Sequence, residues 1–172
     1  MINGNQDNQS PYSISNFLPL IIIGLIIIFF TVVQQILYGF NINHAMSDFM
    51  GSFFIVFSSF KIINLKKFVE AYSTYDIIAQ RYHLYAYIYP FLEFMLGILY
   101  LMRYTLLIAN WITLLLMIIS SIGVGYALSQ KRQVVCACLG AVFKIPMTYV
   151  TLAEDILMGT MALIMLVQYY MY

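Results

Sequence analysis

The run LPLIIIGLIIIFFTVV, residues 18–33, decides the fold class of this chain. It contains no charged residue, and neither does the longer apolar stretch around it, residues 17–40. An α-helix needs roughly 20 apolar residues to cross a lipid bilayer, and this stretch exceeds that length. The sequence therefore predicts a transmembrane helix near the N-terminus.

The composition of the whole chain also indicates a protein that lies mostly in lipid. Of its 172 residues, 63% are hydrophobic and only 9% are charged, whereas about a quarter of the residues of a soluble domain are charged. The net charge of +1 and the lack of a basic run argue against a nucleic-acid partner. We predict an all-α, integral membrane helical bundle whose surroundings are the lipid bilayer.

Four further apolar segments complete the predicted bundle. They cover approximately residues 49–65, 84–102, 105–128 and 148–172. Residues 65–82, between the second and third spans, repeat apolar side chains at helical spacing with cations on the other face, which is typical of a helix lying in the membrane surface. Residues 1–16 are rich in Asn, Gln and Ser, and we expect them to form a disordered polar tail.

The cationic residues are divided unevenly between the two sides of the membrane that these five spans define. Only Arg103 falls on one side, and the other seven Lys and Arg residues share the side of the N-terminus: Lys61, Lys66, Lys67, Arg81, Lys131, Arg132 and Lys144. Cytoplasmic segments of membrane proteins carry the excess of Lys and Arg. We therefore expect the N-terminus and the loop between the last two spans to lie in the cytoplasm.

That loop contains the pair Cys136 and Cys138. A disulfide between them would close a small ring that departs from relaxed geometry, and strained disulfides are easily reduced. The nearby cations of Lys131, Arg132 and Lys144 favour the thiolate, which is the form that attacks disulfides. The pattern favours thiol–disulfide exchange, while binding of a soft metal such as Cu(I) and the absence of any chemical role remain alternatives.

Ionisable side chains inside the predicted spans are the other candidates for function. Glu93 lies near the middle of the third span, where such a side chain is costly and usually functional. Without a partner we expect it to be protonated; it could exchange protons with a thiol, pair with Lys61, or bond to a neighbouring helix as a neutral acid. We expect Lys61 to extend from the end of its helix to the membrane interface.

Glu154 and Asp155 lie near the predicted start of the last span. The spacing of Thr151 and Glu154 is that of a capping box, and acidic residues are stabilised at a helix N-terminus. The alternative is that the two carboxyl groups accept protons or bind a cation. His44 and His83 have no ligand spacing, so no cofactor is expected, and a metal only in the Cu(I) alternative.

Several short motifs appear together in a characteristic order. These are Phe60-Lys61, the stretch AYSTY at residues 71–75, Pro90-x-x-Glu93 followed by Gly97, and Cys136-x-Cys138-x-Gly140. Over about residues 46–168 the chain thereby resembles the methylamine utilisation protein MauE, within the wider group of DoxX-like membrane proteins. The resemblance implies a four-helix membrane domain over residues 46–172, to which residues 17–45 add an extra N-terminal transmembrane helix and loop.

The resemblance also implies a function. The family is associated with the maturation of disulfide-containing exported proteins, such as the small subunit of methylamine dehydrogenase, in the bacterial inner membrane and with a thioredoxin-like partner. Cys136 and Cys138 then become the catalytic pair of a candidate thiol–disulfide oxidoreductase, with Glu93 in a supporting role. Lys61, Glu154 and Asp155 are further supporting candidates, and a copper-handling or transport protein and a structural membrane subunit are the rival interpretations.

Overall fold

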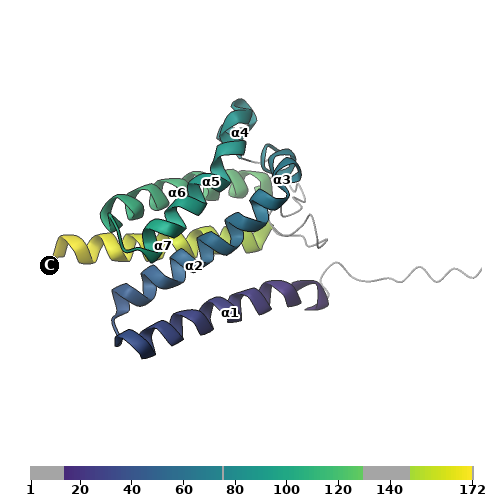
Figure 1. Ribbon diagram of the computed structural model, residues 1–172. Helices are drawn as coiled ribbons and strands as arrows, with labels where there is room; N and C mark the ends of the chain where they lie inside the picture. The colour runs from purple at the N-terminus through teal and green to yellow at the C-terminus, as the bar shows by residue number, and fades with distance from the viewer. Residues whose placement is uncertain (1–13, 75, 130–147, 172) are drawn as a thin grey trace, which may run out of the picture.

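The computed structural model describes residues 14–74, 76–129 and 148–171, and all regular structure in these ranges is helical (Figure 1). The helices are α1 (Ile14–Tyr38), α2 (Ile42–Ile63), α3 (Leu65–Tyr72), α4 (Ile77–Arg81), α5 (His83–Leu101), α6 (Leu106–Ser129) and α7 (Thr148–Met171). Within this part of the chain, α1, α2, α5, α6 and α7 are long and apolar enough to cross a membrane. The predicted all-α integral membrane bundle is confirmed.

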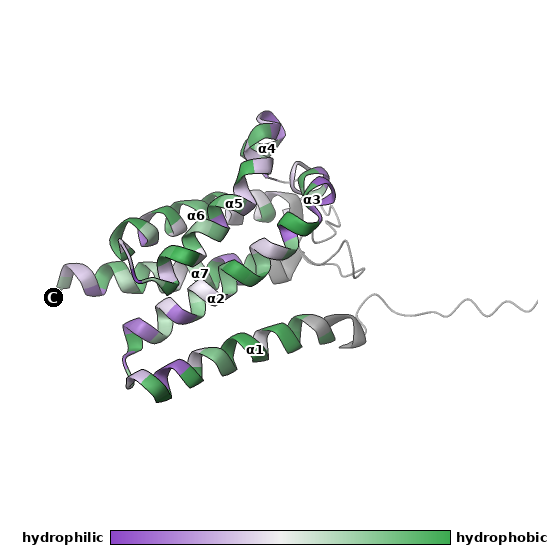
Figure 2. Cartoon of the chain, viewed as in Figure 1, coloured by the Kyte–Doolittle hydropathy of each residue, from purple (hydrophilic) through white to green (hydrophobic). Residues whose placement is uncertain are grey.

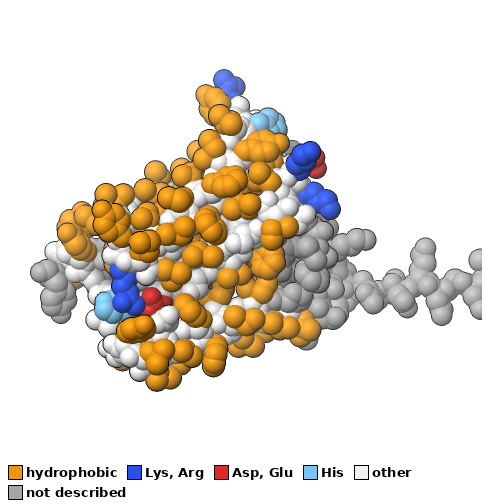
Figure 3. All heavy atoms as spheres, viewed as in Figure 1, with side chains coloured by type: hydrophobic (Ala, Val, Ile, Leu, Met, Phe, Trp, Pro, Cys, Tyr) orange, Lys and Arg blue, Asp and Glu red, His pale blue; other side chains and the backbone are white. Residues whose placement is uncertain are grey.

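The five long helices alternate in direction along the chain and extend between two ends of the bundle (Figure 1). We call the end at which α2 and α6 finish and α7 starts the loop end; α3 and α4 also lie there. The opposite end, with the α1–α2 and α5–α6 connections, is the turn end. The ribbon coloured by hydropathy is mostly hydrophobic along the long helices (Figure 2). Figure 3 shows hydrophobic side chains over most of the visible face between the two ends and charged side chains only near the ends. This distribution is the one that a surrounding bilayer requires.

Helix α1 packs differently from the other long helices. Only 6% of its spanning window is buried, compared with 56% for α2, and its contact with the bundle is a small apolar cluster in which Ile27 meets Phe57 of α2. The main core instead joins α2, α5, α6 and α7. The structure thus has a four-helix core with α1 on its flank.

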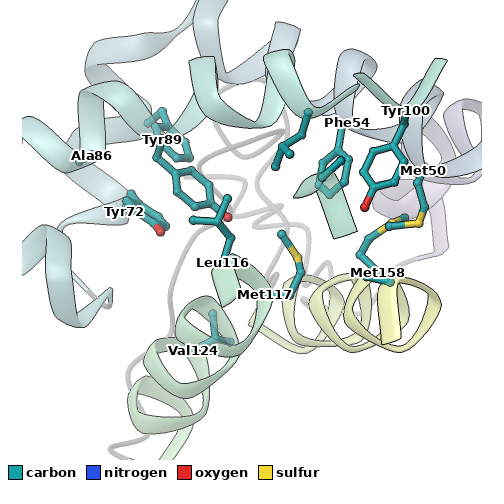
Figure 4. Packing of buried hydrophobic residues seen from close by; sticks show 14 of the residues in the cluster. Met50, Phe54, Tyr72, Ala86, Tyr89, Tyr100, Leu116, Met117, Val124 and Met158 are labelled. Atoms are coloured by element: carbon teal, nitrogen blue, oxygen red, sulfur yellow. The ribbon is translucent and has the colours of Figure 1, made fainter. Parts of the chain in front are cut away.

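Close contact between α2 and α5 depends on two glycines. A Cβ atom at position 97 would lie 2.7 Å from Cγ1 of Ile55 and 3.0 Å from the carbonyl oxygen of Gly51. Small residues at such crossings let membrane helices approach closely. Beside this crossing, the rings of Phe54 and Tyr100 stack with their centroids 6.1 Å apart (Figure 4).

An ion pair fixes the turn end. Nη2 of Arg103, in the α5–α6 connection, donates to both carboxylate oxygens of Asp48 on α2, at 3.1 Å each. Gln35 of α1 donates to the same carboxylate at 3.2 Å. The φ angles of Arg103 and Thr105 are 53° and 49°, which is the left-handed region that ordinary residues rarely adopt.

Three predicted boundaries differ from the structure. Helix α1 begins at Ile14, within the predicted polar tail. Helix α2 begins at Ile42 rather than near residue 49, because Asn41 caps it: its side chain accepts bonds from two backbone N–H groups. The surface helix predicted over residues 65–82 is two helices, α3 and α4, because Asp76 accepts the N–H groups of Ile78 and Ala79 and starts a new helix there.

Candidate functional site

Lys61 and Glu93 form an ion pair inside the bundle. Nζ of Lys61 lies 2.6 Å from Oε1 and 2.5 Å from Oε2 of Glu93. The two side chains are only 10% and 5% exposed. Lys61 sits near the end of α2 and Glu93 in the middle of α5, so the close packing of these two helices brings the groups together.

This pair corrects two expectations. Lys61 does not extend to the membrane interface, because its ammonium group has a buried partner within the bundle. The expectation of a protonated Glu93 assumed an unpaired carboxyl group, and the ammonium group beside it removes that basis. Of the possibilities considered for Glu93, pairing with Lys61 is the one that the structure contains.

Aromatic rings surround the ammonium group of Lys61. Its Nζ lies 5.7 Å from the ring centroid of Phe68 and 5.2 Å from that of Tyr89. The ring of Tyr72 stacks on both, with centroid distances of 5.0 Å and 4.8 Å, and Figure 4 shows Tyr72 and Tyr89 close together. Rings at this distance attract a cation, by up to about 2 kcal/mol where water is excluded. Phe68 and Tyr72 are side chains of α3, and Tyr89 is on α5, so both helices contribute to the cover over the pair.

A small cavity adjoins the ion pair on the side of α6 and α7. Its volume is about 30 Å³, enough for a water molecule. The polar residues that line it are Lys61, Glu93, Ser120, Glu154 and Asp155. The structure therefore brings the four predicted supporting residues together around one cavity, although three different helices supply them.

Asp155 is the most unusual of these groups. The residue is 7% exposed, and its Oδ2 atom has no hydrogen-bond partner among the described residues. The hydroxyl of Ser120 on α6 is a hydrogen-bonding neighbour of the carboxyl group. A buried polar atom without a partner calls for a specific explanation, such as a catalytic role or a bound water.

The capping interpretation of Glu154 and Asp155 is wrong. Helix α7 already includes Thr148, so Thr151 lies inside the helix and cannot be its cap. Both carboxyl groups lie beyond the first turn, where the helix dipole no longer stabilises them much. What Asp155 faces instead is the cavity.

The described residues around the cavity carry ionisable groups of both signs. Lys61 supplies an ammonium group, and Glu93, Glu154 and Asp155 supply carboxyl groups. Such a set can accept or release a proton or stabilise a small cation. Among the described residues, no group of three or more His, Cys, Asp or Glu is placed to hold a metal ion.

A larger pocket, of about 760 Å³, lies at the turn end. Its lining combines apolar side chains with the carboxamides of Asn43, Asn110 and Gln168. None of the lining residues is an Asp, Glu, Lys or Arg. Acid–base chemistry is therefore better supported at the loop end.

The chain that forms this bundle and cavity matches a known protein family. The model of the family described as methylamine utilisation protein MauE matches residues 15–168. The chain belongs to the MauE family. Membership implies a role in methylamine utilisation. Neither the search of curated proteins nor the search of solved structures finds a match.

The MauE match is longer than the resemblance seen in the sequence, because it includes α1 as well as the four core helices. It also contains Cys136 and Cys138, which lie outside the residues that the structure describes. The described neighbours of that segment, the end of α6 and the start of α7, are both at the loop end. The division of the chain into an added helix over residues 17–45 and a domain over 46–172 stays a prediction.

Sequence reasoning missed some residues of this MauE-family site. Ser120 belongs to a cluster of small residues that would equally suit close helix packing, so nothing in the sequence singles it out as a partner of a carboxyl group. Asp76 is buried and accepts a hydrogen bond of 2.9 Å from the hydroxyl of Tyr72. An acidic residue two positions after Thr74, before a short apolar stretch, was a signal for a helix cap that could have revealed it.

Proposed function

We propose that this MauE-family protein is a membrane thiol–disulfide oxidoreductase whose redox pair is Cys136 and Cys138. The observation that carries the proposal is the buried group of Lys61, Glu93 and Asp155 in the half of the bundle nearer the loop end, where the cysteine-containing segment joins α6 and α7. Thiol–disulfide chemistry moves protons together with electrons, and a buried site with several carboxyl groups is suited to holding protons.

The proposed reaction is an exchange with a dithiol partner. A thiolate of the partner attacks one sulfur of the Cys136–Cys138 disulfide, forms a mixed disulfide and releases the other cysteine as a thiolate. The partner's second thiolate then attacks the partner sulfur that is bonded in the mixed disulfide. This closes the partner's disulfide and releases the second cysteine of the pair as a thiolate. Two electrons pass from the partner to the pair, the partner becomes a disulfide, and the two released thiolates each take up a proton. The reverse sequence oxidises the pair.

By its family, the partner is a thioredoxin-like protein, and the wider task is maturation of a disulfide-containing exported protein such as the small subunit of methylamine dehydrogenase. The membrane is the bacterial inner membrane, with the N-terminus and the cysteine loop in the cytoplasm. The exposed cations on the described surface support this orientation, because Lys66, Lys67 and Arg81 are all at the loop end. Arg103, at the turn end, is paired with Asp48.

A redox titration tests the proposed function. The purified protein is equilibrated against glutathione buffers, and free thiols are counted by mass shift after alkylation. We expect a reversible two-electron transition in the range of exchange catalysts, roughly −120 to −270 mV, and not below about −300 mV, where structural disulfides lie. The variants Cys136→Ser and Cys138→Ser should each lose the transition, and one of them should trap a mixed disulfide with the partner.

Two outcomes would refute the redox function. Thiols that never oxidise over this range, combined with Cu(I) binding that requires both sulfurs, would assign the protein to metal handling. Thiols that neither oxidise nor bind Cu(I) would leave a structural membrane subunit. A membrane-impermeant maleimide checks the orientation independently: it should label Cys136 and Cys138 only after the cytoplasmic membrane is permeabilised.

A further inference from the structure

We infer that Asp155 is a proton-binding residue within the membrane, and that the cavity beside it holds the water through which the proton enters and leaves. The inference does not rest on the proposed thiol chemistry, because every group that it uses lies in the described helices. The ligand is a proton, and the site is the carboxyl group of Asp155 with Ser120 and the cavity of about 30 Å³.

An ionised Asp155 would need a counter-charge. Among the described residues that line the cavity, Lys61 is the cation, and both carboxylate oxygens of Glu93 accept its ammonium group. An ionised Asp155 would therefore share a cation that already has a closer partner. In a buried, low-dielectric place an uncompensated charge is avoided by taking up a proton.

One carboxyl oxygen of Asp155 is also unsatisfied within the described helices. Oδ2 of Asp155 has no hydrogen-bond partner among the described residues, and the residue is 7% exposed. A protonated carboxyl group can place an O–H there and donate it to a water in the cavity, which has the volume for one. Ser120, which also lines the cavity, hydrogen-bonds the carboxyl group and so helps to hold it there.

The remaining ionisable groups near the cavity are less suited to this role. Glu93 on α5 is neutralised by Lys61 on α2. Asp76, between α3 and α4, is occupied by two backbone N–H groups and the hydroxyl of Tyr72. Glu154 on α7 lines the cavity too, but it is less buried than Asp155.

Infrared spectroscopy can observe this proton directly. The full-length protein, with Cys136→Ser and Cys138→Ser so that no thiol titrates, is placed in lipid nanodiscs and its spectrum is recorded over a range of pH. We expect the C=O stretching band of a protonated carboxylic acid at neutral pH, its loss as the pH is raised, and a shift of the band in D₂O because cavity water exchanges the proton. The band should be missing at neutral pH in Asp155→Asn.

Three further variants identify the group that binds the proton. Glu70→Gln removes an exposed carboxyl group on α3 and should leave the band unchanged. Glu154→Gln should leave it unchanged as well. Lys61→Met should add a second band, because Glu93 then loses its cation and takes up a proton itself.

Each contrary result overturns the inference. A band that survives in Asp155→Asn, or that disappears in Glu154→Gln, would assign the proton to another group. A wild-type spectrum without the band at neutral pH would mean that Asp155 is ionised. Asp155→Asn is the neutral isostere of the protonated residue, so a folded yield or Tm far below the wild type would mean that the carboxylate itself is needed. None of these readouts involves the cysteines, so the proposed redox function stands or fails separately.

Discussion

Each end of the bundle contains an ion pair that involves α2. At the turn end the partner lies in the α5–α6 connection, and at the loop end it lies in α5, but the pairs have different surroundings. At the turn end, Asp48 is buried while the side chain of Arg103 is 34% exposed. At the loop end, Lys61 and Glu93 are 10% and 5% exposed, aromatic rings cover them, and Asp155 adds another carboxyl group. One pair reaches the surface, and the other is enclosed.

The difference supports a structural role for the pair at the turn end and a functional role for the pair at the loop end. At the turn end one cation meets one carboxylate, and Gln35 supplies a further hydrogen bond, so the charges balance. At the loop end, three carboxyl groups of the described residues line the same cavity as Lys61. Ionisable groups inside a membrane protein are costly and usually mark proton or ion pathways, and an enclosed pair costs more to bury than one that reaches water. Stability alone therefore explains the turn end but not the loop end.

Breaking the enclosed pair should lower the free energy of unfolding more than any other change considered below. Glu93→Gln leaves the ammonium group of Lys61 buried without its ionised partner, and removing one member of a buried pair typically costs about 3–5 kcal/mol. The free energy of unfolding can be followed in mixed micelles by the fluorescence of Trp111, the single tryptophan. We expect the double variant Lys61→Met/Glu93→Gln to recover most of the loss.

The double variant is the control, because it removes the charge that the single variant leaves behind. If Glu93→Gln were as stable as the wild type, Lys61 would have to be neutral or satisfied by Asp155. The two ends would then not differ in the way described above.

The spans could be predicted from the sequence, but the pairing inside the bundle could not be decided. Apolar length is a local property, so all five predicted spans correspond to helices. The start of α2 was misplaced because Asp48 looked like part of a polar loop, whereas Arg103, distant in the sequence, neutralises it inside the protein. A long-range partner leaves no local signal.

The same limitation applies to the candidate site. Pairing of Lys61 with Glu93 was one of several alternatives, and choosing it required the contact between α2 and α5. Adjacent residues on a helix point about 100° apart. Which of Glu154 and Asp155 faces the core therefore depends on how α7 is rotated against its neighbours, and a single sequence does not specify that.

A substitution at the glycine crossing between the two ends should lower the free energy of unfolding less than breaking the enclosed pair does. In Gly97→Ala the new Cβ would lie 2.7 Å from Cγ1 of Ile55 and 3.0 Å from its backbone nitrogen, so α2 and α5 must separate. Overpacking of this kind costs typically about 1–3 kcal/mol. Gly125→Ala on α6 is the matched control, because nothing lies within 4 Å of its Cβ position, and its unfolding should be nearly unchanged.

The glycine variant also sharpens the comparison between the ends. Gly97 lies between Glu93 and the turn that carries Arg103, so separating the helices strains both ion pairs. We expect the enclosed pair to suffer more, and Lys61→Met/Glu93→Gln to reduce the effect of Gly97→Ala. If the two sets of changes were strictly additive, the crossing and the enclosed pair would be independent.

Removing the pair at the turn end should cost less again. Arg103→Gln should lower the free energy of unfolding by only about 1 kcal/mol, because its partly exposed guanidinium group interacts with Asp48 through solvent-screened charge. High salt should reduce this loss but leave that of Glu93→Gln unchanged, since buried pairs are screened much less. Arg81→Gln, which removes an exposed cation on α4, serves as the control. A salt-independent loss at position 103 would mean that the turn end is as enclosed as the loop end.

The smallest expected effect separates the charge of Arg103 from its backbone conformation. Its φ angle of 53° is unfavourable for most residues, whereas Asn tolerates this region because its short side chain can bond locally. Arg103→Asn loses the same ion pair as Arg103→Gln but recovers part of the backbone cost, so it should be more stable than Arg103→Gln by roughly 0.5–1 kcal/mol. Thr105→Asn is the matched variant, since Thr105 has a φ of 49° and precedes α6, and there the substitution should stabilise the protein without touching the ion pair. Equal stabilities for Arg103→Asn and Arg103→Gln would show that the ion pair alone fixes the turn, and the turn end would then depend on its charges as fully as the loop end does.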